Sequence, residues 1–145
     1  MNSHRASGPQ QRAQRVAAVV CLRGEETADQ PATRRDYLAL ATQLPHLVRH
    51  NGLAHTLSYL QLLAAPAGRN NPAAQMLLDD WWSPVGTANA GLHLALLGET
   101  PAAPSNGADY RLASRLALAE AALFKRFAQV QLASSAMPGP EGRTP

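Results

Sequence analysis

Apolar positions recur along this chain every three or four residues, which is the spacing of one face of an α-helix. The first such stretch covers residues 10–23, where Val16 and Val20 lie one turn apart. We expect a helix there that stops at Gly24, because glycine is common just past a helix end. Residues 24–32 are then expected to form a loop.

A second helix is predicted up to Asn51, because Asn51-Gly52 is a good left-handed stop. Thr33 is a candidate cap for its start, with Asp36 three residues further on as in a short capping box. Pro45 falls inside the apolar stripe of this helix. Proline lacks an amide hydrogen and disfavours α geometry in the residue before it, so we expect a kink or a break there.

Two more helices follow at short distance. Leucines on one face predict a helix over residues 53–64. Asn71 as cap and Pro72 at the first helical position begin the next one. We expect that helix to run to Trp82 and to stop at the Ser-Pro pair that follows.

The last third of the chain predicts one short and one long helix. Thr87 is a candidate cap for the short helix, which ends at Gly98. Residues 98–108 contain two prolines and are expected to be a loop. The long helix covers residues 109–135 and is the longest in the chain.

The composition agrees with a helical fold. The chain has 28 Ala, 21 Leu, six Val and no Ile. Ala and Leu are the best helix formers, whereas β-branched residues favour strands. We therefore predict an all-α fold, a compact bundle of about six helices with a long C-terminal helix. Residues 1–9 are expected to be flexible, residues 10–136 to form a single helical domain and residues 137–145 to be a disordered tail.

Cationic residues gather near both ends of the helical region. Residues 1–23 carry four Arg and no acid, and residues 111–135 carry four cationic residues and one acid. Residues 79–110 carry four acids and no Lys or Arg. The net charge of +3 says little by itself about nucleic acid. Two basic segments on either side of an acidic one make the helices that carry them candidates for an anionic partner.

The predicted last helix has one basic and one apolar face. At about 100° per residue, one face holds Arg111, Arg115, Ala122, Lys125, Arg126 and Gln129. The opposite face holds Ala113, Leu116, Leu123 and Phe127. The basic face is either the solvated side of an amphipathic helix or a stripe that contacts phosphates, and no acid lies on it to pair the cations. Glu120 lies within the apolar face, so we expect it to pair with a basic residue of another helix.

The first helix repeats this arrangement more weakly. Arg12, Arg15 and Arg23 share a side away from Val16 and Val20. We expect these three arginines to lie on the surface.

Sites for metals or catalysis have little support. His46 and His50 are four residues apart and His55 follows, but a zinc site needs a third ligand and usually an acid. No Asp or Glu lies between Asp36 and Asp79. No two carboxylates are expected on one helix face near a histidine, as an acid–base pair would need, and no Gly-rich phosphate loop is present. We therefore expect no metal, no cofactor and no enzymatic activity.

Cys21 is the single cysteine and excludes an intramolecular disulfide. A lone cysteine indicates a reducing compartment and is most simply a small core residue. The apolar run from Val16 to Leu22 is too short to span a membrane. We expect a soluble, cytoplasmic protein.

Trp81 and Trp82 are adjacent. Neighbouring side chains on a helix diverge by about 100°, so both are buried only if the helix is covered on two sides. We expect one Trp in the core, and the other is a candidate anchor at a protein interface.

Two segments, in this order and spacing, are similar to a known family. The first is LPHLVRHNGL from Leu44 to Leu53, followed by TLSYL at 56–60. The second is Tyr110-Arg111, then ALA at 117–119 and KRFA at 125–128. They resemble the small helical subunit of type III-B (Cmr) CRISPR effector complexes over about residues 10–135. The family often has an acid near the position of Leu116, where the nearest acid here is Glu120.

This resemblance implies a non-catalytic role. Members of that family stack beside the repeated backbone subunits and further copies of themselves, and they help form the channel in which target RNA pairs with guide RNA. Cleavage belongs to other subunits. The motifs imply RNA contacts by Arg111, Lys125 and Arg126; Arg115 joins them by helical position, and Arg34, Arg35 and Arg49 by charge alone.

Two other function classes remain open. The chain can be a protein–protein interaction module without RNA contact, whose basic helix docks on an acidic partner with Trp81 or Trp82 as anchor. A helix-turn-helix DNA regulator is disfavoured, because the helix over 53–64 has no basic residue except His55 to enter a groove.

Overall fold

The computed structural model describes residues 8–88 and 107–136, and these residues form helices without a strand. The elements are α1 (Pro9–Glu26), α2 (Pro31–Asn51), α3 (Leu53–Ala64), α4 (Pro72–Leu77), the π-helical turn η1 (Leu78–Trp82), α5 (Ser83–Ala88) and α7 (Gly107–Ala136). The predicted all-α fold with a long C-terminal helix is confirmed. The short helix expected after Thr87, the loop over 98–108 and the two flexible ends lie wholly or mostly outside the described residues.

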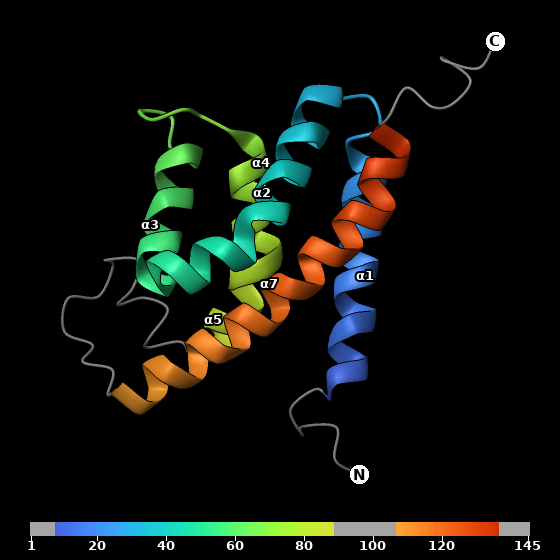
Figure 1. The fold of residues 1–145 in the computed structure, drawn as a ribbon. Helices are drawn as coiled ribbons and strands as arrows, with labels where there is room; N and C mark the ends of the chain where they lie inside the picture. Colours follow the sequence, from blue (N-terminus) through green and yellow to red (C-terminus); the bar gives the residue numbers. More distant parts are fainter. Residues whose placement is uncertain (1–7, 89–106, 137–145) are drawn as a thin grey trace.

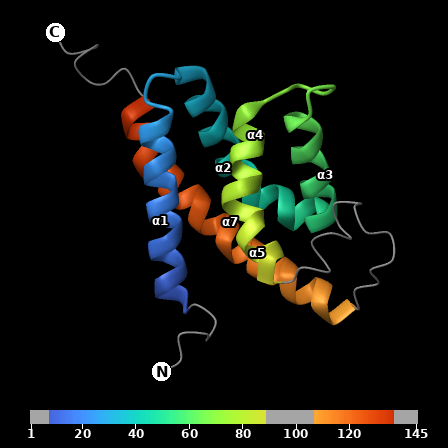
Figure 2. The same cartoon turned by 180° about the vertical axis from the view of Figure 1, so that it is seen from behind.

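Helix α7 crosses the molecule and packs against α1, α2, η1 and α5 (Figure 1). Seen from behind, α1 and the α4–η1–α5 segment lie side by side in front of α7 (Figure 2). The buried side of α7 consists mainly of small residues: Ala113, Ala117, Ala121, Phe124, Ala128 and Leu132. We call these six residues the α7 seam. Small side chains let neighbouring helices approach closely, so one helix can contact four other elements.

The apolar face predicted for α7 is therefore rotated relative to the buried one. Ala113 is buried as expected, but Leu116, Leu123 and Phe127 are only half-buried and pack at the edge of the core. These three longer side chains flank the seam and pack against the core from its edge.

The segment from α4 through α5 is continuous, so the prediction that it stops at Ser83-Pro84 is wrong. A proline ring normally clashes with the carbonyl four residues before it. Here the five residues before Ser83 form a wider turn, in which the Ser83 amide donates to the Leu78 carbonyl five residues back. Such a turn relaxes the usual helical register just before the proline and allows the helix to continue.

Two predicted helix ends are also wrong. Helix α1 runs through Gly24 to Glu26. Gly24 does not end the helix but packs inside it as a buried residue, where an added Cβ would lie 3.0 Å from Leu132 of α7. The Thr27 hydroxyl donates to the Arg23 carbonyl at 2.6 Å just past this helix end. Helix α2 begins at Pro31 rather than near Thr33, since proline fits the first helical position.

Helix α2 contains Pro45 without a break. The helix changes direction along its length (Figure 1), so of the two outcomes expected at this proline the structure shows the kink. The predicted helix over 53–64 and the cap at Asn71, whose Oδ1 accepts from the Ala73 amide at 2.9 Å, are confirmed. None of the described helices is long and apolar enough to cross a membrane.

Gly52 joins α2 to α3 without an intervening loop. Its backbone has φ 85° and ψ 161°, a region that is essentially restricted to glycine. The Thr56 hydroxyl donates to the Gly52 carbonyl at 2.8 Å and holds the first turn of α3. The direction of α3 relative to α2 therefore depends on this one residue.

Gly52→Ala should destabilise the protein by about 1–3 kcal/mol, because an L side chain is strained in this backbone region. The free energy of unfolding from urea denaturation measures the effect. Asn51→Ala, one residue earlier in an exposed helical position, is the control and should stay within about 0.5 kcal/mol. Equal stability of the two variants would contradict the assigned role of Gly52.

Candidate nucleic-acid interface

Four cationic residues of α7 lie together on its solvent side. Arg111, Arg115, Lys125 and Arg126 are all exposed, and we call them the α7 basic face. Within the part of the chain that the structure describes, none of them forms an ion pair; Arg126 lies over the Phe127 ring, 5.9 Å from its centroid. They span about 22 Å along the axis at a rise of about 1.5 Å per residue. The structure thus brings these four predicted residues onto one open surface.

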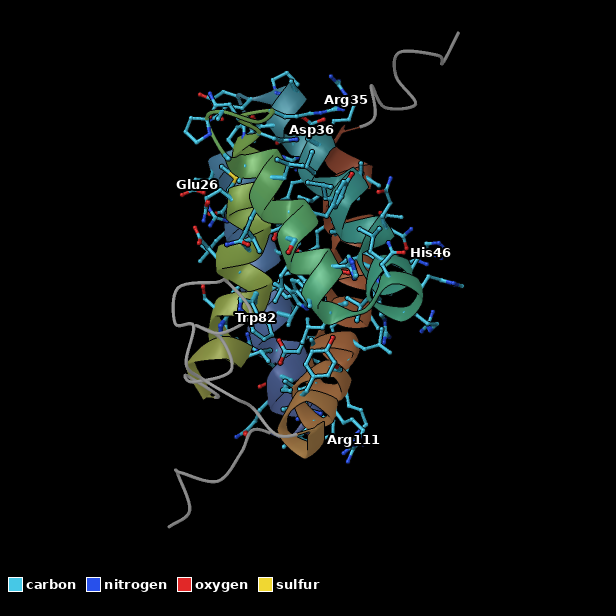
Figure 3. All side chains as sticks on the ribbon, turned by 90° about the vertical axis from the view of Figure 1, so that its left-hand side faces the viewer. Glu26, Arg35, Asp36, His46, Trp82 and Arg111 are labelled. Atoms are coloured by element: carbon cyan, nitrogen blue, oxygen red, sulfur yellow. The ribbon has the colours of Figure 1, made fainter. Side chains whose placement is uncertain are left out.

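Helix α2 adds cationic residues from its outer side. Arg35 and Arg49 are exposed. Figure 3 shows His46 of α2 and Arg111 of α7 projecting on the right-hand side of the view, with Arg35 at the top. Arg49 lies three residues from His46 and so shares its helix face.

Arg34 has a different position from its neighbour. It is half-buried, and its Nη1 donates to the Gly24 carbonyl at 2.6 Å. This contact ties the start of α2 to the last turn of α1. Arg34 is a candidate RNA contact by charge alone, and in the structure its guanidinium helps to hold two helices together.

Of the three α1 arginines expected on the surface, Arg15 and Arg23 are half-buried and bind carboxylates of other elements. Arg15 forms an ion pair with Glu120 of α7, which is buried. This confirms that Glu120 pairs with a basic residue of another helix. Arg23 pairs with Asp80 at 2.7 Å and with Glu26 at 2.6 Å. Glu120 is buried and the Asp80 side chain is only 10% exposed. Each therefore needs a cation, because a buried charge without a partner is costly.

Asp80 receives hydrogen bonds from two helices. The Nε and Nη2 atoms of Arg23 donate to it at 2.7 and 3.0 Å, and the Tyr37 hydroxyl donates at 2.8 Å. Burial, followed by the negative charge of Asp80, raises the pKa of Tyr37. The hydrogen bond to Asp80 raises the pKa of Arg23. This network fixes α1 and α2 against η1.

The histidines gather near the junction of α2 and α3. The rings of His46 and His50 lie 4.1 Å apart between centroids with 36° between their planes. Among the described residues, no three His, Cys, Asp or Glu side chains are placed to hold a metal ion. His50 and His55 instead line a surface hollow of about 630 Å³ together with Leu47, Asn51 and Tyr59. We call it the junction hollow.

Tyr59 was not among the residues singled out for a site from the sequence. The signal available in the sequence is its position four residues after His55, on the same helix face. The structure adds that Tyr59 is 42% exposed. Periodicity alone cannot distinguish such a residue from a core aromatic, because exposure depends on which elements cover that face.

Cys21 and the two tryptophans also differ from expectation. Cys21 is exposed, because Val16, Val20 and Gly24 occupy the buried side of α1. Trp81 and Trp82 are 0% and 1% exposed, and Trp81 Nε1 donates to the Ala117 carbonyl at 2.9 Å. The π turn packs against α7 and α3, so it is covered on two sides and neither Trp offers a surface anchor.

The chain matches a family model described as CRISPR-associated protein (Cas_Cmr5) over residues 9–131. This match covers α1 to most of α7 and includes the whole α7 basic face. The chain belongs to the Cmr5 family. No curated protein and no solved structure matches it significantly. The resemblance found in the sequence motifs is thus confirmed.

As a Cmr5 family member, this protein is a subunit of the multi-subunit Cmr effector complex of type III-B CRISPR systems. The family consists of small structural subunits. Arg15, Arg23 and Arg34 are engaged within the fold, whereas the α7 basic face, Arg35 and Arg49 are exposed.

Arg15→Met should destabilise the protein by about 3 kcal/mol, because it leaves the Glu120 carboxylate buried without its cation. Arg15→Met combined with Glu120→Leu should recover most of this loss. Chemical denaturation measures both variants. Arg115→Met, on the exposed face of α7, is the control and should cost less than about 0.5 kcal/mol. Equal losses for Arg15→Met and Arg115→Met would contradict a structural role for the pair.

Tyr37 predicts a loss of stability at alkaline pH. Its pKa is raised in the folded state, so the unfolded chain releases this proton first, near pH 10. The contribution of Tyr37 is complete below about pH 10 and is lost as the pH rises further. Tyr37→Phe should unfold about 1 kcal/mol more easily at neutral pH, because it loses the bond to Asp80.

Above pH 10 the free energy of unfolding of Tyr37→Phe should fall less steeply than that of the parent protein. Urea denaturation at a series of pH values gives both slopes. Tyr59→Phe is the matched control, because Tyr59 is exposed, and should leave the pH profile unchanged. Identical slopes for the parent protein and Tyr37→Phe would contradict the prediction.

Proposed function

We propose that this Cmr5 family member is a non-catalytic subunit that stacks along the repeated backbone subunits of the effector complex, beside further copies of itself. In this position it helps to hold the guide and target RNA. The supporting observation is the α7 basic face, four exposed cationic residues that have no acidic partner in the described part of the chain.

The chemistry of the α7 basic face suits a phosphate backbone. Cations that are not neutralised by the protein release counterions when they meet phosphates, and this release provides affinity without reading sequence. Its length of about 22 Å exceeds the spacing of successive phosphates several-fold. Arg35 and Arg49 extend the cationic surface onto α2.

The ion-paired carboxylates of the fold fit a structural rather than a catalytic role. The two carboxylates that are most buried in ion pairs, Glu120 and Asp80, are held by Arg15 and Arg23. These groups stabilise helix contacts and are not presented to a substrate. RNA cleavage is therefore assigned to other subunits.

Reversing charge at Arg111, Arg115 and Lys125 together should weaken RNA binding by the purified chain and by the assembled complex. Three lost phosphate contacts lower the slope of log affinity against log salt by about 2 to 3. Fluorescence anisotropy with labelled RNA at several salt concentrations measures this slope. The single variant Arg69→Glu, an exposed position outside α7, is compared with each single reversal and should have little effect.

A triple variant that enters the complex and binds target RNA with the parental salt slope would overturn the proposal. Capture of partner subunits from nuclease-treated extract tests the alternative of a protein-only module. If the triple variant loses partner subunits in that experiment while RNA binding by the free chain is unchanged, the α7 basic face is a protein docking surface.

A further inference from the structure

The junction hollow is built from the last turn of α2 and the first two turns of α3. Leu47, His50 and Asn51 are spaced three and four residues apart, so they share one side of the end of α2. His55 and Tyr59 are four apart and share one side of α3. The positive φ of Gly52 turns the chain at once from one helix to the next and brings these two sides face to face.

The lining combines flat rings with a hydrogen-bonding amide. Tyr59 is 42% exposed, and His50, Asn51 and His55 are exposed as well. His50 stacks on His46, which holds its ring at the rim. A volume of about 630 Å³ lies within the range of sites that hold one small planar ligand.

The surroundings of the hollow favour an anionic occupant. The hydroxyl of Tyr110, at the start of α7, lies 3.3 Å from the Ala54 amide, so the first turn of α7 rests against the helix junction. Arg111 follows Tyr110 directly and begins the α7 basic face. Arg49 is exposed on the last turns of α2, but it lies about 100–160° around the helix from Leu47, His50 and Asn51 and so faces away from the hollow. The cationic residue near the hollow is therefore Arg111, in the part of α7 that touches the helix junction.

An unpaired nucleotide has the chemistry that this site would recognise. Its base offers a π face for stacking on tyrosine and histidine, and its edge offers donors and acceptors to an amide such as that of Asn51. Its phosphates suit a nearby arginine such as Arg111. A paired base cannot enter, because its faces are covered by its neighbours in the duplex.

We propose that the junction hollow binds one unpaired nucleotide of RNA, with the base against Tyr59 and His55 and the phosphates toward the start of α7, where the α7 basic face begins at Arg111. The inference rests on the proposed function, and it adds a site for single-stranded RNA at one end of the backbone-binding surface. The α7 basic face accepts any phosphate chain, whereas the hollow discriminates between unpaired and paired RNA.

The test compares two RNA probes on the full chain, a labelled single-stranded oligouridine and a blunt RNA duplex. Tyr59→Ala should weaken binding of the single strand about tenfold and leave duplex binding unchanged, because one base–aromatic stack is lost. Tyr59→Phe keeps the ring and should bind like the parent protein. Leu22→Ala removes an apolar side chain on α1 that is 64% exposed, and it serves as the control.

Photo-cross-linking provides a second readout that does not depend on affinity. Oligouridine carrying 5-iodouracil should cross-link to Tyr59 or His55, and mass spectrometry identifies the peptide. Cross-links confined to α7 would overturn the inference.

The two proposals fail in different ways. If Tyr59→Ala has no effect on either probe while the triple reversal in α7 lowers binding of both, the hollow does not take a nucleotide and the proposed function stands. If the parent chain and complex bind neither probe, both are overturned. If Tyr59→Ala abolishes entry into the complex and leaves RNA binding intact, the hollow receives a partner subunit and the inference is overturned.

Discussion

The close approach of α7 to its neighbours is the constraint on which the rest of the structure depends. Its seam is made largely of alanines, so α1, α2 and η1 can all pack against one helix. The indole of Trp81 reaches far enough into this packing to donate to the Ala117 carbonyl. On the α1 side the same closeness favours Gly24, because a Cβ there would lie 3.0 Å from the end of the Leu132 side chain, which would have to shift by a few tenths of an ångström.

This packing divides the cationic residues into two groups. Arg15 and Arg23 lie where α1 meets buried carboxylates, and they compensate the charges of Glu120 and Asp80. The α7 basic face lies about a third of a helical turn away from the seam, and it meets no acid among the described residues. Helix α7 therefore stabilises the core with one side and leaves the other for an anionic partner, so that substitutions on the two sides can be tested independently.

The junction between α2 and α3 connects the fold with the surface. Pro45 bends α2, and Gly52 then reverses the chain within a single residue. The polar rings that follow face one another across a hollow instead of being spread along a straight helix. A backbone torsion available to glycine thus determines whether His50 and Tyr59 can act on the same ligand.

The sequence by itself determined the helical class, the stop at Asn51-Gly52, the basic face of α7 and the need of Glu120 for a partner, because these depend on propensity and on periodicity within one helix. Only the tertiary structure decided that Arg15 is this partner, that Gly24 is a packing residue and that Cys21 is exposed. Those outcomes depend on which helix covers which face and at what distance. The spacing of residues along one helix contains no information about the helix that covers it, so it could not predict these three outcomes.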